Sequence, residues 1–483
     1  MSSDKKSRPK ARLPRGFRDR PAADIAAERQ MLETIRRVYE SYGFEPLETP
    51  AFEYTDALGK FLPDLDRPNE GVFSLKDDDG QWLSLRYDLT APLARYVAEN
   101  FQHLPKPFRR YQVGTVWRNE KPGPGRYREF TQFDADTVGS ASSAADAELL
   151  MMTCDALEAL GLKRGEYIVK INSRELLDGV LTAAGVDSSK RGTVLRAIDK
   201  LDRLGADGMR ALLGKGRKDE SGDFTSGAEL SDEQITSVIR FAEIGKARDD
   251  FRKRIGQLTG FGSIATNAAN NLDEIVGICV RNEYETDRVM IDTSVIRGLE
   301  YYTGPVFEAQ LTFPIKNERG NEIVFGSVAG GGRYDDLVAR FTGQQVPATG
   351  ISIGVSRLLT ALTARGLSPE TKPLIVVLTT DDASRSFAMA RELREAGLRA
   401  EAYVGTKKFG DQMKYADKRG AAIAVIEGAD ERGDGRVTLK DLNRGAELAK
   451  EIESRAEWLS EREAQITVRR DQLASAVKTL LNR

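Results

Sequence analysis

The chain has 483 residues and a formal net charge of −2, which predicts roughly three globular domains and gives no overall sign of a nucleic-acid binder. Two cysteines and one histidine exclude a Cys₄ or Cys₂His₂ zinc site and a disulfide framework, and any histidine-based triad would need His103. We therefore expect Arg, Asp, Glu, Gln and Tyr to carry the chemistry. The chain shows no apolar run long enough to span a membrane and no secretory h-region, so we expect a cytoplasmic protein.

Residues 1–20 are strongly basic and are predicted to form a flexible tail. Solubilising disorder is the simpler interpretation, and the alternative is an arm that contacts a phosphate backbone. Only Asp4 and Asp19 oppose the cations, which are Lys5, Lys6, Arg8, Lys10, Arg12, Arg15, Arg18 and Arg20.

The next region, residues 21–178, mixes helical periodicity with short β-like runs. Its first helix is predicted from Ile25 to Tyr42, and an extended stretch punctuated by prolines follows from Phe44 to Phe52. Asp88 is placed to cap a second helix near Leu89 to Asn100, which gives it a purely structural explanation. A helix over Ala144–Leu160 and a strand over Tyr167–Ile171 are also expected.

Two extended runs, which flank a loop at residues 121–125, carry the richest polar pattern of the chain. Alternate residues of a strand share a face, so Gln132, Asp134 and Asp136 point one way, while Phe133 and Ala135 point the other. Arg118 and Glu120 share a face in the same manner. A solvated sheet face with paired charges would explain this pattern. The alternative is a polar platform under a charged ligand, where Arg meets phosphate and carboxylates meet an amine.

Residues 179–282 have helical periodicity and few aromatic residues, which predicts a helical insertion containing a loop at Gly214–Gly222. Residues 283–366 return to strand-like sequence, beginning with a strand at Val289–Asp292. Residues 372–483 alternate apolar runs with helical segments, as in a small α/β domain. The elements expected there are strands at Leu374–Leu378, Ala400–Val404 and Ala422–Ile426, helices at Ala383–Ala396 and Lys407–Arg419, and a terminal helix from about Arg455.

Three further motifs combine glycines with polar or aromatic residues. Glycines bracket Tyr301 and Tyr302 in the segment 297–304, and three glycines precede Arg333 in the segment 330–336. Core packing of the tyrosines and a simple turn are the plain interpretations. In the segment 350–358 a strand leads into a helix, with Arg357 in its first turn. A cation there opposes the helix dipole unless an anion lies nearby, which favours a binding role.

Together these motifs resemble the class II aminoacyl-tRNA synthetases, and within them the histidyl-tRNA synthetase family. Residues 44–52, 117–130 and 350–358 are similar to the three class motifs, and the strings Arg86–Thr90, Arg297–Gly304 and Gly330–Tyr334 are similar to family-specific ones. The resemblance implies an α/β and α+β multidomain protein. Its core would be an antiparallel sheet over residues 21–178 and 283–366, with the helical insertion at 179–282 and an anticodon-binding domain at 372–483.

The resemblance implies a role for each matching residue. Arg118 would bind the ATP α-phosphate, Glu120 the adenine and Arg357 the γ-phosphate, with Arg126 and Arg333 as weaker phosphate candidates. Arg297 would neutralise charge near the reacting carboxylate. The residues that would bind L-histidine are Asp88, Thr90 and Gln132 at its amino group, and Asp136 and Tyr302 at its imidazole with Tyr301 alongside.

The implied activity is ligation of L-histidine to the 3′ end of histidine tRNA through a histidyl-adenylate, by a homodimer. ATP with Mg²⁺ would be a substrate complex, and no tightly bound cofactor or resident metal is expected. Where many bacterial members carry a Gln-Lys pair in the second motif, this chain has Gly123 and Pro124. We therefore expect it either to read the tRNA acceptor end differently or not to require the extra 5′ guanosine that is usual in histidine tRNA. Candidate cations for the tRNA in the last domain are Lys407, Lys408, Lys414, Lys418 and Arg419, which a solvated helix face would also explain.

Two alternatives remain at this stage. One is a regulatory paralogue that senses histidine without charging tRNA, like the synthetase-like subunit of ATP phosphoribosyltransferase. The other is a non-catalytic tRNA-binding module of a larger assembly. The first is disfavoured because Arg118, Arg297 and Arg357 are present, together with the last domain.

Overall fold

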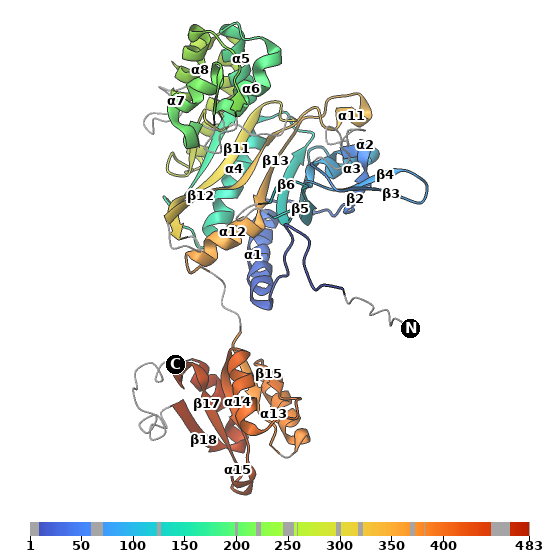
Figure 1. Cartoon of the computed structure of the whole chain (residues 1–483), viewed down its shortest axis with the longest axis vertical. Helices are drawn as coiled ribbons and strands as arrows, with labels where there is room; N and C mark the ends of the chain where they lie inside the picture. Colours follow the sequence, from blue (N-terminus) through green and yellow to red (C-terminus); the bar gives the residue numbers. More distant parts are fainter. Residues whose placement is uncertain are drawn as a thin grey trace, which may run out of the picture. The chain divides into compact units, whose positions relative to one another are not determined.

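The computed structural model divides into two compact units, residues 1–369 and 370–483, which are described one at a time (Figure 1). The structure describes residues 9–58, 71–122, 127–198, 201–218, 224–244, 256–257, 259–295, 301–316, 322–367, 372–380, 382–445 and 464–482. No helix among these residues is both long enough and apolar enough to cross a lipid bilayer.

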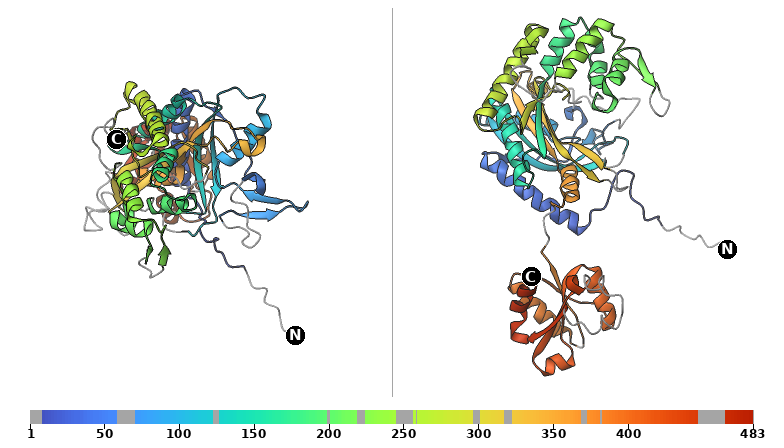
Figure 2. Two further views of the ribbon diagram at one scale, coloured as in Figure 1. Left: turned by 90° about the horizontal axis from the view of Figure 1, so that it is seen from above. Right: turned by 90° about the vertical axis from the view of Figure 1, so that its left-hand side faces the viewer.

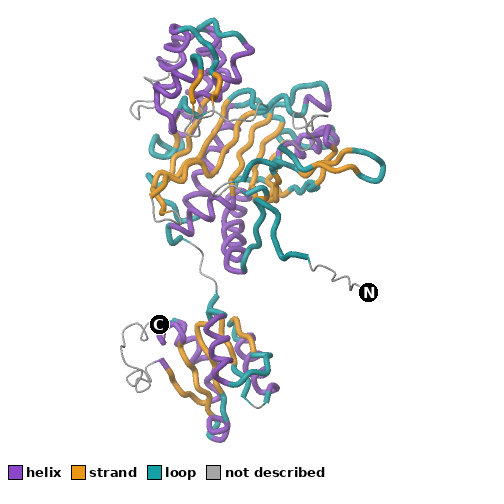
Figure 3. Tube along the Cα trace, in the orientation of Figure 1, coloured by secondary structure: helices purple, strands orange, loops and turns teal. Residues whose placement is uncertain are grey.

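The first unit is built on an eight-stranded sheet, in the order β1-β5-β6-β13-β12-β11-β7-β10 (Figure 3). The pairs β1–β5 and β7–β10 are parallel, and every other neighbouring pair is antiparallel. The strands are β1 (Glu45–Pro46), β5 (Phe108–Trp117), β6 (Glu129–Val138), β7 (Tyr167–Ser173), β10 (Val289–Ile291), β11 (Pro305–Lys316), β12 (Glu322–Arg333) and β13 (Ala348–Gly354).

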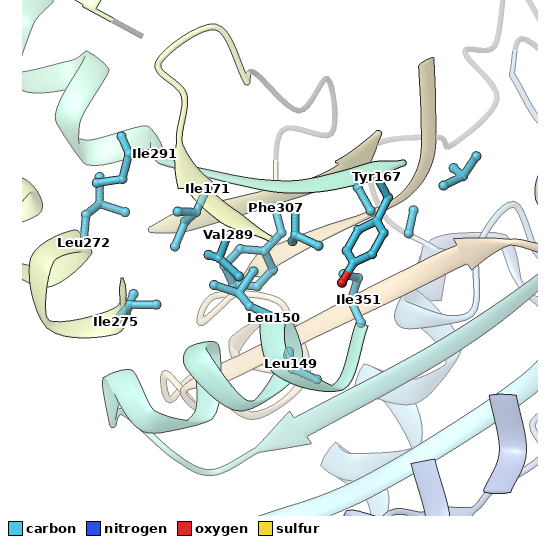
Figure 4. Packing of buried hydrophobic residues seen from close by; sticks show 14 of the residues in the cluster. Leu149, Leu150, Tyr167, Ile171, Leu272, Ile275, Val289, Ile291, Phe307 and Ile351 are labelled. Carbon is cyan, nitrogen blue, oxygen red and sulfur yellow. The ribbon is translucent and has the colours of Figure 1, made fainter. Parts of the chain in front are cut away.

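One face of this sheet is covered by helices and forms the main hydrophobic core. In Figure 4, Leu150 of α4 (Ser143–Ala159) lies close to Val289 and Phe307 of the sheet. The alternation predicted for β6 is confirmed, because Phe133 and Ala135 belong to this core, while Gln132, Asp134 and Asp136 line a cavity. Three other helices contribute to the core: α1 (Ala22–Ser41), α10 (Ser263–Arg281) and α12 (Val355–Ala364).

A small three-stranded sheet, in the order β2-β4-β3, lies beside the large one. Short and medium helices accompany it, and α3 begins directly after Asp88 and Leu89. The elements are β2 (Phe52–Tyr54), α2 (Thr55–Leu58), β3 (Ser74–Lys76), β4 (Trp82–Leu85), α3 (Thr90–Asn100) and α11 (Ala339–Thr342).

The predicted helical insertion is present and shares the core of the first unit (Figures 1 and 2). Its first helix begins at Arg174 rather than near residue 179, and its last helix, α10, also packs against α4. The first strand of a short hairpin, β8, lies within the loop predicted at Gly214–Gly222. Strands of three residues are too short for the two-residue period of hydrophobicity to be detected in the sequence. The elements are α5 (Arg174–Ala183), α6 (Arg191–Ile198), α7 (Leu201–Leu213), β8 (Gly216–Lys218), β9 (Phe224–Ser226) and α8 (Asp232–Ile244), with 3₁₀ turns at Ser188–Lys190 and Thr259–Phe261.

The second unit has a five-stranded sheet in the order β15-β14-β16-β17-β18. Alternate residues of the apolar strand β14 enter two clusters, one on each face, as a fully buried strand requires. The strands are β14 (Leu374–Val377), β15 (Arg399–Ala402), β16 (Ala421–Ile426), β17 (Arg436–Asp441) and β18 (Gln465–Arg469), and the helices are α13 (Ala383–Glu395), α14 (Phe409–Lys418), α15 (Ala429–Gly433) and α18 (Leu473–Leu481).

The terminal helix predicted from Arg455 is wrong over residues 465–469, which form β18. Ile466 and Val468 pack on the apolar cluster of this unit while their neighbours face outward, which is the two-residue period of a strand. The helix begins only at Leu473, and residues 455–463 lie outside the described part of the chain.

Part of the predicted flexible tail contacts the rest of the first unit, through Gly16, Phe17, Arg18 and Arg20. The Phe17 and Phe73 ring centroids lie 6.0 Å apart. Arg20 forms an ion pair of 2.6 Å with Glu28 of α1. Amino-acid composition does not predict these contacts, because each depends on one specific pair of residues. Residues 1–8 lie outside the described residues.

Candidate active site

A small polar cavity of about 40 Å³ opens on the face of the large sheet opposite the core. Strands β6, β12 and β13 form its floor, and the start of α3 and the segment after residue 300 form its walls. Seven of the residues predicted to form the site line this cavity: Asp88, Thr90, Arg118, Gln132, Asp136, Tyr301 and Tyr302.

Arg110 of β5 lies next to the cavity, outside its lining, with a fully buried side chain. Register places it opposite Asp136 of β6, and the two side chains form an ion pair of 2.9 Å. Arg110 also donates a hydrogen bond of 2.9 Å to the carbonyl of Leu89, directly before α3. The Asp136 carboxylate accepts a further hydrogen bond of 2.5 Å from the Tyr334 hydroxyl. These contacts hold the Asp136 carboxylate in place in the lining of the cavity.

Asp134 lies between Gln132 and Asp136 on the same face. Burial, together with the nearby Asp136 carboxylate, raises the pKa of Asp134 above its ordinary value, against the effect of Arg110. Among the described residues, Asp134 Oδ1 and Gln132 Oε1 are buried without a hydrogen-bond partner, whereas Gln132 Nε2 donates to Ser352 Oγ over 2.7 Å. Buried acceptors of this kind are matched to a ligand that brings hydrogen-bond donors.

Asp88 contacts the first turn of α3 and also lines the cavity. Its Oδ1 accepts from the backbone N–H groups of Thr90 and Ala91 at 3.2 and 3.0 Å, so the carboxylate caps the first turn of α3. Its Oδ2 lies 3.4 Å from the Tyr301 hydroxyl, which donates to it on the cavity side. Burial raises the pKa of Asp88, and the Ala91 N–H opposes this shift. The helix start therefore holds a carboxylate in place at the wall of the cavity.

Arg118 projects from the end of β5 to the cavity. Its Nε donates to the Tyr87 carbonyl over 3.1 Å, and its guanidinium lies 5.2 Å from the Phe130 ring centroid. Glu120 is exposed two residues further on, outside the cavity lining. Arg357 stands in the first turn of α12, as predicted, and is also exposed outside that lining.

Glycines on the neighbouring strands make room for the buried carboxylates. A Cβ atom at Gly350 would lie 1.9 Å from Asp136 Oδ1, and one at Gly331 would lie 1.9 Å from the Gly350 carbonyl oxygen. Neither position can accept a side chain without moving the floor of the cavity. The triple-glycine segment is thus a close-packed part of a strand rather than a turn.

Arg333, a weaker phosphate candidate, makes its contacts away from the cavity. Arg333 belongs to β12, but its guanidinium pairs with Asp146 of α4 at 2.5 Å and donates to the Ser140 carbonyl at 2.9 Å. It lies outside the cavity lining and ties the sheet to α4. The alternation of a strand explains this, because Arg333 points away from the face that Gly332 presents to Tyr302.

Other candidates fall outside the described residues, namely Arg126, Arg297 and the Gly123–Pro124 pair. The sequence did not assign roles to Tyr334 and Ser352, which line the cavity, or to Arg110, which pairs with Asp136. Arg110 could have been suspected only by pairing β5 with β6 in the correct register. Within the described residues, no cluster of three or more His, Cys, Asp or Glu side chains is placed to hold a metal ion.

This largely antiparallel sheet, with carboxylates on its open face and arginine at the end of the central hairpin, is the arrangement of a class II aminoacyl-tRNA synthetase. The histidyl-tRNA synthetase family model matches residues 16–358, and an anticodon-binding-domain model matches residues 374–479. The chain therefore belongs to the histidyl-tRNA synthetase family, and the predicted family and fold class are confirmed.

Curated relatives agree over nearly the full length. A histidine–tRNA ligase of Rhizobium meliloti is 57% identical over 98% of this chain and 96% of the relative, and one of Brucella abortus is 56% identical over 99% and 98%. A crystal structure of histidyl-tRNA synthetase from a Nostoc species is 29% identical, with a TM-score of 0.72 over 98% of this chain and 100% of that one.

One structural neighbour bears on the regulatory alternative. A Bacillus halodurans protein, described as an ATP phosphoribosyltransferase regulatory subunit/histidyl-tRNA synthetase, has a TM-score of 0.65 over 85% of this chain and 97% of its own. Its identity of 21% shows a shared fold only. The full-length relatives at 55–57% identity are named as ligases, so the regulatory alternative is not favoured.

Replacing Asp134 by Asn is expected to reduce the loss of stability with rising pH. Because burial and Asp136 raise the pKa of Asp134, the folded state binds more protons than the unfolded state, whose Asp pKa is about 3.9. The free energy of unfolding therefore decreases as the pH rises from that value to the raised pKa, by at most about 1.4 kcal/mol per pH unit. Thermal unfolding at several pH values should show the advantage of Asp134→Asn over the wild type growing with pH.

Asp78→Asn, at an exposed position, serves as the control and should follow the wild type at every pH. A constant difference between Asp134→Asn and the wild type would contradict the assignment.

Proposed function

We propose that this chain activates L-histidine with ATP and transfers the histidyl group to the 3′ end of histidine tRNA, with the cavity as its amino-acid site. The observation that carries the proposal is the acidic floor and wall of a cavity in a chain of this family. Asp88, Asp134 and Asp136 surround a space that a cation would enter favourably. The amino acid brings an ammonium group and an imidazole N–H, both of which donate hydrogen bonds.

The amino group of histidine is assigned to Asp88, Thr90 and Gln132. Asp88 is held by the first turn of α3, and Gln132 by Ser352, so both side chains are oriented before the substrate arrives. Preorganised partners of this kind bind with less loss of side-chain freedom. The imidazole is assigned to Asp136 and Tyr302, with Tyr301 at the wall. A polar pocket of matched donors and acceptors rejects amino acids that leave its buried groups unpaired.

ATP, bound with Mg²⁺ as the substrate complex, is assigned to the open end of the cavity. Arg118 is held at this end by the Tyr87 carbonyl and the Phe130 ring, and we assign it to the α-phosphate. Glu120 is assigned to the adenine and Arg357 to the γ-phosphate. Arg126 and Arg297 remain proposed on the resemblance of their motifs alone.

The activation and transfer of histidine require positioning of the substrates and stabilisation of charge, and no enzyme nucleophile takes part. The histidine carboxylate attacks the α-phosphorus of ATP, a P–O bond forms, and pyrophosphate leaves with its electron pair. The 3′-hydroxyl of the terminal adenosine then attacks the adenylate carbonyl, and AMP leaves as the ester forms. Arg118 supplies fixed positive charge where negative charge develops on phosphate oxygens.

The tRNA is assigned to the second unit, which matches the anticodon-binding model. Of the cations predicted there, Arg419 pairs with Glu401 at 3.0 Å and Lys414 lies 3.7 Å from Asp411. Lys407, Lys408 and Lys418 are exposed on or near α14. We also propose a cytoplasmic location, which suits two cysteines that are both buried as free thiols.

Histidine-dependent exchange of labelled pyrophosphate into ATP tests the function. The wild type should catalyse exchange with histidine, and Asp136→Ala should lose most of it through a raised histidine KM, since removing a charged hydrogen-bond partner costs about 1.5–3 kcal/mol. Asp336→Ala, at an exposed acid outside the cavity, is the control. Absence of exchange by the wild type would remove the enzyme assignment and leave a binding protein.

A homodimer is proposed through one face of the sheet β2-β4-β3. Register places Phe52 opposite Leu85, and Tyr54 and Leu75 opposite Leu83, so these five side chains share one face. Phe52, Tyr54 and Leu75 are 44%, 56% and 46% exposed in the single chain. An exposed apolar face of this kind marks an interaction surface, and a second copy of the chain supplies a matching one.

Charge introduced on this face should separate the dimer. Light scattering after gel filtration should give a dimer for the wild type and a monomer for the double variant Tyr54→Lys, Leu75→Lys. Phe224→Lys changes an exposed aromatic residue of the hairpin β8–β9 and should leave the dimer intact. A double variant that stays dimeric would contradict this interface.

A further inference from the structure

The basic segment before α1 contacts the loop that joins β5 to β6 on both of its sides. The antiparallel ladder of these strands extends to one further bond, in which the Arg118 N–H donates to the Arg128 carbonyl over 2.9 Å. The N–H of Arg128 then donates to the Gly16 carbonyl, also over 2.9 Å. Residues 14–20, which we call the N-terminal arm, thus continue the hydrogen bonding where the ladder ends.

Gly16 fits between the two sides of this loop. A Cβ atom there would lie 2.9 Å from Arg128 Cγ on one side and 3.2 Å from Pro122 Cβ on the other. Its φ of +86° is also one that residues with a side chain rarely adopt. Gly16 therefore allows the backbone of the arm to approach the loop more closely than another residue would.

Arg18 makes the second contact with the loop. Its guanidinium carbon lies 4.5 Å from the centroid of the Tyr127 ring, within the range of a cation–π interaction. On either side of this contact the arm is fixed to the rest of the unit. Phe17 packs against Phe73, and Arg20 pairs with Glu28 of α1. The arm is thus anchored independently of the loop that it contacts.

The loop held in this way carries the residues assigned to ATP. Arg118 is the first residue of this loop and lines the cavity. The Glu120 carbonyl accepts a hydrogen bond of 2.9 Å from Arg128 Nε. On the outer side Asn119 N–H donates to the Gly71 carbonyl over 3.1 Å. Arg128 therefore links the arm directly to the backbone of Glu120.

We propose that the N-terminal arm is a positioning element for the ATP-binding loop, in which Arg18 and Gly16 hold Tyr127 and Arg128 so that Arg118 and Glu120 face the nucleotide. The inference rests on the proposed function, since it concerns the ATP subsite of that same site. It replaces the sequence-based alternative in which the basic arm contacts a phosphate backbone of the tRNA.

Pyrophosphate exchange in the absence of tRNA separates the two explanations. Arg18→Ala should raise the KM for ATP about two- to fivefold, the effect of losing one half-buried cation–π contact, with the KM for histidine unchanged. Arg18→Lys keeps a cation over the ring and should restore most of the ATP affinity, a rescue that a general loss of stability would not show. Tyr127→Leu should match Arg18→Ala, and the two changes together should add little.

Arg15→Ala is the matched control, because it removes an exposed cation of the same arm and should leave the exchange kinetics unchanged. Gly16→Ala strains the closest approach and should raise the KM for ATP further than Arg18→Ala.

The proposal is overturned if Arg18→Ala keeps the wild-type KM for ATP, whether or not tRNA charging changes. A defect confined to charging would instead assign the arm to the tRNA. Absence of exchange by the wild type would count against the proposed function itself. In that case, calorimetric titration of the wild type and of Arg18→Ala with ATP, in the presence of histidine, would still compare their affinities for ATP.

Discussion

The ion pair between Arg110 and Asp136 is the interaction on which the site depends. Burying a carboxylate is costly unless a partner compensates its charge, and two or more acids on one strand face repel each other. Arg110 of β5 is fully buried and pairs with Asp136 on this face of the sheet. By also donating to the Leu89 carbonyl, it links the acidic floor to the start of α3, where Asp88 is held.

The two faces of one sheet divide structure from chemistry. Phe133 and Ala135 belong to a core that helices cover, while Gln132, Asp134 and Asp136 on the other face of β6 form the floor of the cavity. The core fixes the backbone of β6, and the backbone fixes the spacing of the acids. Glycines on β12 and β13 then give those acids room, since a methyl group at Gly350 would overlap Asp136. Rigid strands therefore place the polar groups, as accurate substrate binding requires.

Much of this site could be predicted from the sequence, because strand alternation and helix capping act locally. The alternation of β6 assigned Gln132, Asp134 and Asp136 to one face, and the polar start of α3 identified Asp88. The partner of Asp136 could not be found in this way, because it depends on how β5 pairs with β6. The contact of Arg333 with Asp146 could not be predicted for a related reason: the neighbours of Arg333 in the sequence are glycines of the cavity, yet the strand directs its side chain toward Asp146.

Elements with few apolar residues were also difficult to predict. The strand β18 lies in a charged stretch, and only its packing on the second unit reveals its two-residue period. The sequence of the arm before α1 predicts a solvated basic tail, because a glycine and one cation–π contact produce no periodic pattern of apolar residues. Each of these features is set by tertiary contacts between distant segments, which composition and periodicity do not encode.

The kinetic constants of Arg110→Lys in tRNA-free pyrophosphate exchange test the central claim most directly. Arg110 Nη2 makes both the contact with Asp136 and the hydrogen bond to the Leu89 carbonyl, and the shorter lysine side chain keeps the charge but does not bring its ammonium to that position. If Arg110 orients Asp136 for the imidazole, the KM for histidine should rise by at least about tenfold, while the KM for ATP and the unfolding temperature change little. Wild-type affinity for histidine in this variant, or an equal change in both KM values, would contradict the account.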